Sequence, residues 1–183
     1  MRLLRWGSRF GLIMSLALSF AVLLNLRSTT EAGGTAPLIT TFSIVAFDPD
    51  TNEYGIAVQS KFFAVGDVVP FAQADSGALA TQAVGNPRFG PRALELFKEG
   101  VSAQAVIEKL LAGDPDRESR QLGAVDTKGT PATFTGSKCL PWAGGKTGEH
   151  YTVQGNLLAG PQVLDAMAAA YEAAPGDLAS RLV

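Results

Sequence analysis

Short runs of β-branched and aromatic residues follow one another through the first half of the chain, beyond its amino-terminal segment. The runs 40–47 and 54–60 flank the sequence Asp-Pro-Asp-Thr-Asn, whose residues suit a tight turn, and together they predict a β-hairpin. Residues 68–74 and 78–82 predict two more strands, and Pro70 favours an irregular or edge position for the first of these.

Further along, the apolar spacing changes to that of amphipathic helices. Pro91 and Gly100 frame a helix over 92–99 as its first-turn and carboxyl-cap residues, and Ser102 can cap a second helix whose apolar residues share one face. The later elements predicted in the same way are strands over 121–126, 132–135 and 151–154, and helices from Pro161 and over 177–183.

The order of these elements indicates the fold class. Hairpin-linked strands come before and after the helices instead of alternating singly with them, which favours antiparallel sheets with helices on their faces. We therefore predict an α+β domain over residues 40–183.

The amino-terminal segment has the layout of a secretory signal. Three arginines within the first nine residues precede a nearly uncharged apolar run over 11–26, and small residues follow near Ala32. We expect a signal peptide over 1–32 and a linker over 33–39, so the mature domain would be exported, periplasmic or secreted. An uncleaved signal anchor is the alternative, although the run is shorter than the roughly 20 residues of a full membrane span.

Composition and charge exclude several classes of function. The 183 residues carry a formal net charge of −2, which gives no support to a nucleic-acid partner, and membrane contact would come only through an anchor. One cysteine and one histidine exclude a disulfide framework and a His-rich metal site. We expect no metal and no cofactor, because neither ligand spacing nor a nucleotide-binding motif occurs. Cys139 is interpreted as a buried small hydrophobe, and self-association stays open.

Six separated motifs follow one another after residue 39: TTFSIVAFD, GIAVQSKFFAVGDVVPFAQADSGALATQ, NPRFGPRALELF, RQLGAVD, TGSKCLPWAGGKTG and VQGNLLAGPQVLDAMAAAYE. In these motifs the chain resembles a bacterial family, domain of unknown function 1028. That family is placed by fold among the N-terminal-nucleophile hydrolases, so the resemblance implies a four-layer αββα sandwich of antiparallel sheets. Family members usually continue through further strands, and we therefore expect this chain to be truncated at its carboxyl terminus.

The resemblance also implies a nucleophile. Hydrolases of that superfamily use the first residue of the mature chain, a Thr, Ser or Cys, with its own α-amino group as base. An amine with a pKa near 8 can accept the hydroxyl proton without any histidine. Thr41 is the candidate nucleophile by this resemblance, and an ordinary β-branched strand residue is the alternative. Because Thr40 and the leader precede it, activity would require a cut between Thr40 and Thr41.

Residues around the nucleophile supply further candidates. By the resemblance, Lys61 would lower the pKa of the nucleophile through its nearby positive charge. Asp75 would orient Lys61 or bind substrate, and the amide of Asn86 would donate to an oxyanion. Arg88 would clamp a substrate carboxylate, and Asn156 would add a polar contact beside the pocket. The alternatives are solvated surface charges and simple turn formation by Asn86.

These observations lead to two hypotheses of different classes. The first is a hydrolase that cleaves an amide bond of a small or peptide-like substrate through Thr41 and Lys61. The second is a non-catalytic exported domain that binds a ligand or partner, because a fold alone does not determine activity.

Overall fold

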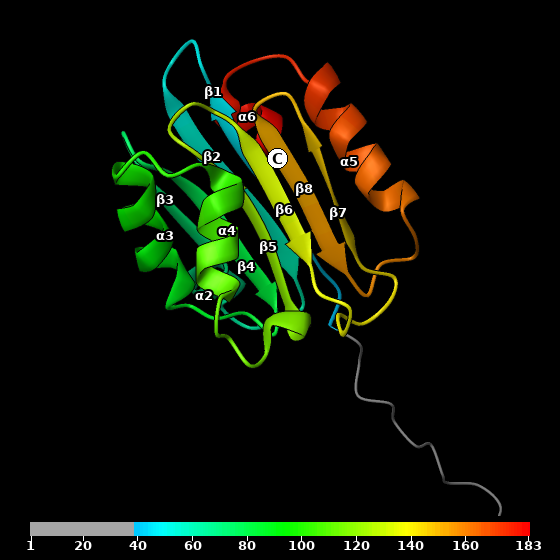
Figure 1. The fold of residues 1–183 in the computed structure, drawn as a ribbon. Helices are drawn as coiled ribbons and strands as arrows, with labels where there is room; N and C mark the ends of the chain where they lie inside the picture. Colours follow the sequence, from blue (N-terminus) through cyan, green and yellow to red (C-terminus); the bar gives the residue numbers. More distant parts are fainter. Residues whose placement is uncertain (1–38) are drawn as a thin grey trace, which may run out of the picture. The chain divides into compact units, whose positions relative to one another are not determined.

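The computed structural model describes residues 39–183 of the chain (Figure 1). The predicted signal segment over 1–32, and the predicted linker over 33–39 except its last residue, lie outside the described residues. The strands are β1 (Thr41–Asp48), β2 (Glu53–Ser60), β3 (Pro70–Gln73), β4 (Gly77–Ala83), β5 (Arg120–Val125), β6 (Pro131–Thr135), β7 (Gly144–Gly148) and β8 (Tyr151–Asn156). The helices are α2 (Val65–Val68), α3 (Phe89–Lys98), α4 (Ala103–Leu111), α5 (Gln162–Ala173) and α6 (Leu178–Leu182), with a 3-10 turn at Arg117–Ser119.

The strands of the described chain form two antiparallel sheets of four strands each. One sheet has the order β2-β1-β8-β7, and the other has the order β3-β4-β5-β6. In the first sheet, Thr41 is paired with Ser60 of β2 on one side and with Asn156 of β8 on the other. The ends of β2 and β8 therefore meet at the start of β1.

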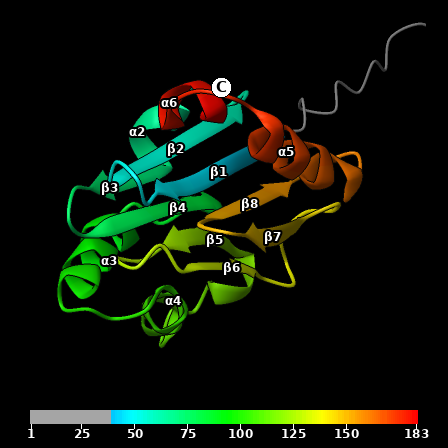
Figure 2. The ribbon, with the colours of Figure 1, turned by 90° about the horizontal axis from the view of Figure 1, so that it is seen from above.

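Three apolar clusters hold these elements together. Val45 of β1 packs with Ala80 of β4 in the cluster between the two sheets. The neighbouring residue Ile44 belongs to the cluster under α5 and α6, and Leu79 belongs to the cluster under α3 and α4. Because successive strand side chains point to opposite faces, each central strand serves two clusters. Figure 2 shows α5 and α6 over the sheet that contains β1, and α3 and α4 beyond the other sheet.

The mixed α+β class with antiparallel sheets is confirmed, as are most of the predicted elements. The hairpin of β1 and β2 forms in the predicted place. Ser102 caps α4 by accepting a hydrogen bond from the backbone N–H of Ala105 at 3.4 Å. Helix α3 begins at Phe89, two residues before Pro91. A proline is tolerated there because the N–H groups of a first helical turn have no partner within the helix.

Three elements differ from the sequence-based expectation, and one of them, the short helix α2, was not predicted. Residues 144–148, for which no element was predicted, form β7 at the edge of the first sheet, where they pair with β8. The sequence GGKTG has little β-propensity, so only the pairing with its neighbour makes it a strand. The strand expected over 68–74 is shorter, because α2 takes up its first residue and Val69 precedes β3.

Candidate functional site

Thr41 lies at an end of the first sheet, between Ser60 and Asn156. Its hydroxyl oxygen is 2.8 Å from that of Ser60, within hydrogen-bond distance, and 7% of the residue is exposed. Two residues along the strand and on the same face, Ser43 donates a hydrogen bond to Gln82 of the opposite sheet at 2.8 Å. The side chain of Thr41 therefore points into the space between the two sheets.

A cavity of about 500 Å³ adjoins Thr41, and we call it the Thr41 cavity. Polar residues line it from three strands: Thr41, Thr81, Gln82 and Asn156. Most of the remaining lining is apolar and includes Ile39, Phe62, Val65, Val69, Val84 and Leu140. A largely apolar hollow with a few convergent polar groups has the usual composition of a small-molecule site. Thr41 is thus part of the wall of a hollow with this composition.

Amide side chains behind the cavity form a hydrogen-bond network between the sheets. Asn156 donates from Nδ2 to Oε1 of Gln121 at 3.0 Å, and Gln82 donates from Nε2 to the same oxygen at 2.9 Å. Gln154 donates from Nε2 to the hydroxyl oxygen of Ser43 at 2.6 Å, and that hydroxyl donates onward to Gln82. All five residues are buried. Because every member is held by others, the network fixes the orientation of the Asn156 amide at the cavity wall.

Sequence reasoning did not select Gln121 or Gln154 as site residues. Both stand in strands, β5 and β8, whose every residue is buried. A glutamine inside such a strand must find a hydrogen-bond partner, so an amide in a segment predicted to be a central strand is the signal that points to them. Gly123 makes room for this network, because a side chain there would collide with the amide of Gln154.

Cys139 also lines the Thr41 cavity. Its thiol donates to the backbone carbonyl of Arg120 at 3.3 Å, and burial raises its pKa above the ordinary value. A protonated thiol is a weak nucleophile. The interpretation of Cys139 as a buried small hydrophobe is therefore met only in part, because the residue is half-buried and lines the cavity.

A buried ion pair supports one wall of the cavity. Arg120 donates from Nε and Nη2 to the two carboxylate oxygens of Asp114, at 2.8 and 3.1 Å, and both side chains are less than 10% exposed. The remaining nitrogen of the guanidinium, Nη1, donates to the backbone carbonyl of Val84, which lines the cavity. The pair therefore connects the loop after α4 to the segment that follows β4.

Acid should weaken this ion pair. The hydrogen bond from Arg120 holds the pKa of the Asp114 carboxyl below its ordinary value of 3.8. Since the pKa is lower in the folded state, ionised Asp114 adds stability above the unfolded-state pKa, and this contribution disappears as the pH falls through the folded-state pKa. In urea titrations, we expect the difference in free energy of unfolding between wild type and Asp114→Asn to be constant from about pH 5 to 8 and to shrink below about pH 4. An unchanged difference at about pH 2 would rule out this role for the carboxylate.

Comparison with known proteins assigns the chain to a family. The model of a family of unknown function, DUF1028, matches residues 41–183. The chain belongs to the DUF1028 family. The family resemblance inferred from the sequence motifs is therefore confirmed.

A solved structure of a DUF1028 protein has the same fold. It is the crystal structure of a protein from Silicibacter pomeroyi, which is 32% identical to this chain and matches it with a TM-score of 0.75. The match covers 78% of this chain and 64% of the S. pomeroyi chain, so the chain spans less than two thirds of that protein. No curated protein matches the chain significantly.

Three other candidate residues of this DUF1028 chain lie near the Thr41 cavity but outside its lining. Lys61 directly follows Ser60 and is exposed. Asn86 accepts a hydrogen bond from the backbone N–H of Arg88 at 3.1 Å, while its own N–H donates to the hydroxyl of Thr81 at 3.1 Å. Asn86 therefore shapes a turn beside the cavity, and Arg88 is exposed just before α3.

Asp75 lies at the opposite end of the second sheet. It occupies the turn between β3 and β4, where its carboxylate accepts a hydrogen bond from Asn52 at 3.2 Å. Thr81, which lines the cavity, is six residues further along, a distance of roughly 20 Å in an extended strand. The structure thus brings Asn156 beside Thr41 and keeps Asp75 away from both.

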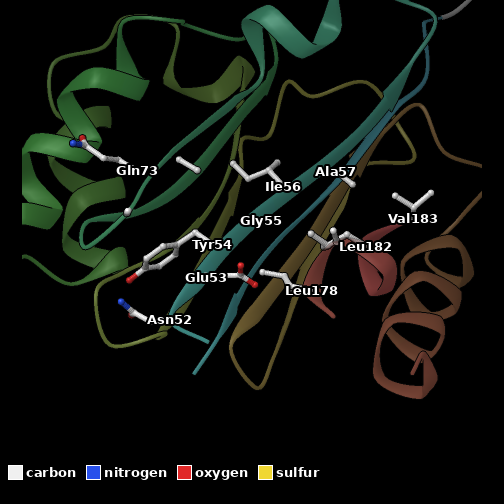
Figure 3. Close-up of a pocket in the computed structure, with 13 residues that line it drawn as sticks. Asn52, Glu53, Tyr54, Gly55, Ile56, Ala57, Gln73, Leu178, Leu182 and Val183 are labelled. Atoms are coloured by element: carbon white, nitrogen blue, oxygen red, sulfur yellow. The ribbon is translucent and has the colours of Figure 1, made fainter. Parts of the chain in front are cut away.

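A second cavity, of about 590 Å³, lies along the edge strand β2 (Figure 3). Leu178 and Leu182 of α6 form one wall, and Tyr54 and Ile56 of β2 lie on the other side. Glycine at position 55 lets α6 approach β2, because a side chain there would collide with Leu182. None of the candidate residues lines this cavity.

Neither a metal-binding cluster nor a membrane-spanning helix is found in the described part of the DUF1028 chain. Across residues 39–183, no three His, Cys, Asp or Glu side chains are grouped so that they could hold a metal ion. In the same residues, none of the helices combines the length and apolar character of a membrane span.

Proposed function

We propose that this chain is an exported hydrolase of the N-terminal-nucleophile type, which cleaves an amide bond of a small or peptide-like substrate through Thr41. The observation that carries the proposal is the position of the Thr41 hydroxyl, beside Ser60 at the wall of a 500 Å³ cavity. The three apolar clusters, one between the sheets and one on each outer face, support the proposed four-layer αββα sandwich.

The proposed reaction needs a free amine on Thr41. A cut between Thr40 and Thr41 would supply it, at the point where Ser60 and Asn156 flank the strand. The Thr41 oxygen would then form a bond to the substrate carbonyl carbon while the new α-amine takes the hydroxyl proton. As the tetrahedral intermediate collapses, the carbon–nitrogen bond breaks and the leaving amine takes this proton. Water then attacks the ester, which releases the carboxylic acid and restores the Thr41 hydroxyl. None of these steps requires a histidine.

Neighbouring residues have distinct parts in this proposal. The Ser60 hydroxyl would orient the nucleophile from 2.8 Å. Asn156 gives one N–H to Gln121, so its second N–H is available for the oxyanion, and an amide fixed beforehand is an effective donor. Lys61 directly follows Ser60 in the chain and is exposed. Its predicted role is to lower the pKa of the Thr41 nucleophile through its positive charge.

The amino terminus of the mature protein tests this function. We expect Edman sequencing of the purified protein to give the series Thr-Phe-Ser-Ile, beginning at Thr41. If the cut is autocatalytic, Thr41→Val should leave the Thr40–Thr41 bond intact, whereas a cut variant would point to an external protease. A mature chain that begins at Gly33 or Pro37 would favour the alternative, a non-catalytic domain that binds a ligand in the same cavity.

A further inference from the structure

Exposed apolar side chains gather at the Thr41 cavity. Exposed large hydrophobic residues usually lie scattered singly on a protein surface, and a contiguous group of them is typical of a binding site. Here Phe62 is 50% exposed and Val84 and Leu140 are each 56% exposed, and all three line this one cavity. Their apolar surface is therefore arranged around a single hollow.

The interior of the Thr41 cavity is also mainly apolar. Val65, Val68 and Val69 line it beyond Phe62, and they come from α2 and the residue after it. No carboxylate lines the cavity, and Lys138 is its one charged residue among those that the structure describes. A cationic ligand would find no counter-charge there. A ligand with a long apolar part and a neutral or anionic polar end fits both observations.

We propose that the Thr41 cavity binds an aliphatic acyl chain, so that the substrate class is an N-acyl amide with an apolar acyl group. The identification of the amide as the reacting bond rests on the proposed function, whereas binding of the chain does not. The acyl chain lies against Phe62 and the valines, and its carbonyl lies at the polar end formed by Thr41 and Asn156. At roughly 30 Å³ for each water-sized group, the cavity of about 500 Å³ holds about seventeen such groups, close to the number of non-hydrogen atoms in an acyl chain of about ten carbons with its head group.

Calorimetric titration with N-acylglycines of increasing acyl length tests this proposal. The protein is titrated as wild type, which we expect to begin at Thr41, and as uncut Thr41→Val, in which no turnover obscures binding. We expect the affinity to rise about fourfold for each added methylene, up to a limit set by the cavity, in both proteins. An affinity that does not change with chain length would overturn the proposal.

Two neighbouring phenylalanines provide a matched pair of variants. Phe62 lines the cavity, whereas Phe63 is 92% exposed and does not line it. Phe62→Ala should weaken binding of N-decanoylglycine about tenfold, and Phe63→Ala should leave it unchanged. Equal effects of the two substitutions would also overturn the proposal.

The same titrations separate this inference from the proposed function. Chain-length-dependent binding without release of glycine would leave the acyl site standing and count against hydrolysis through Thr41. Hydrolysis of short amides without any gain from longer chains would support the nucleophile and exclude the acyl site.

Discussion

A Thr41→Val variant should lose amide hydrolysis by at least about 10³-fold in kcat/KM and still fold, because the nucleophile of a covalent mechanism has no substitute. Valine keeps the β-branched shape of threonine and removes only the hydroxyl. The side-chain contact thereby lost is the one with Ser60, so we expect a decrease of about 0.5–1.5 kcal/mol in the free energy of unfolding. Release of free amine from a panel of N-acyl amides gives the rates, and urea titration gives the stability.

Three comparisons make this result specific to the hydroxyl. Thr41→Ser retains a nucleophile and should keep measurable activity, whereas the same Thr→Val change at exposed Thr51, in the β1–β2 turn, should have no effect. Sequencing the amino terminus of each variant shows whether inactivity comes from the reaction itself or from failure of the preceding cut. A Thr41→Val protein as active as wild type would exclude the proposed mechanism, whatever its fold.

Local signals in the sequence were sufficient for much of the fold. The turn between β1 and β2 contains residues that favour tight conformations, and Ser102 carries the side chain that a helix cap needs. Each of these features acts over a few neighbouring residues. The elements that depend on them were therefore predicted in the right places.

The arrangement of the site depends on contacts that no local pattern contains. Thr41 and Asn156 are 115 positions apart and become neighbours only because β1 and β8 pair. Asp75 is much nearer to Thr41 in sequence. The turn between β3 and β4 nevertheless places Asp75 at the end of the second sheet that is far from the Thr41 cavity. In the same way, Gln121 accepts a hydrogen bond from Asn156 only because the two sheets pack face to face. Pairing and sheet stacking, not residue type, decide which polar groups meet.

The largest loss of stability should follow from Arg120→Met. Methionine preserves an apolar stem but leaves the Asp114 carboxylate, whose side chain is 8% exposed, without its partner. Removing one member of a buried pair typically costs about 3–5 kcal/mol, because the other charge stays desolvated. That is a large part of the 5–15 kcal/mol that stabilises a typical domain, so we expect a clear shift of the urea midpoint.

Two further variants identify the cause of that shift. Arg92→Met removes an arginine from an exposed pair with Glu95 on α3, and we expect its urea midpoint to stay close to that of wild type. Arg120→Met combined with Asp114→Leu removes both buried charges and should recover most of the lost stability. If the double variant is as unstable as Arg120→Met alone, the loss comes instead from the hydrogen bond to the Val84 carbonyl, and the cavity wall depends on that single contact.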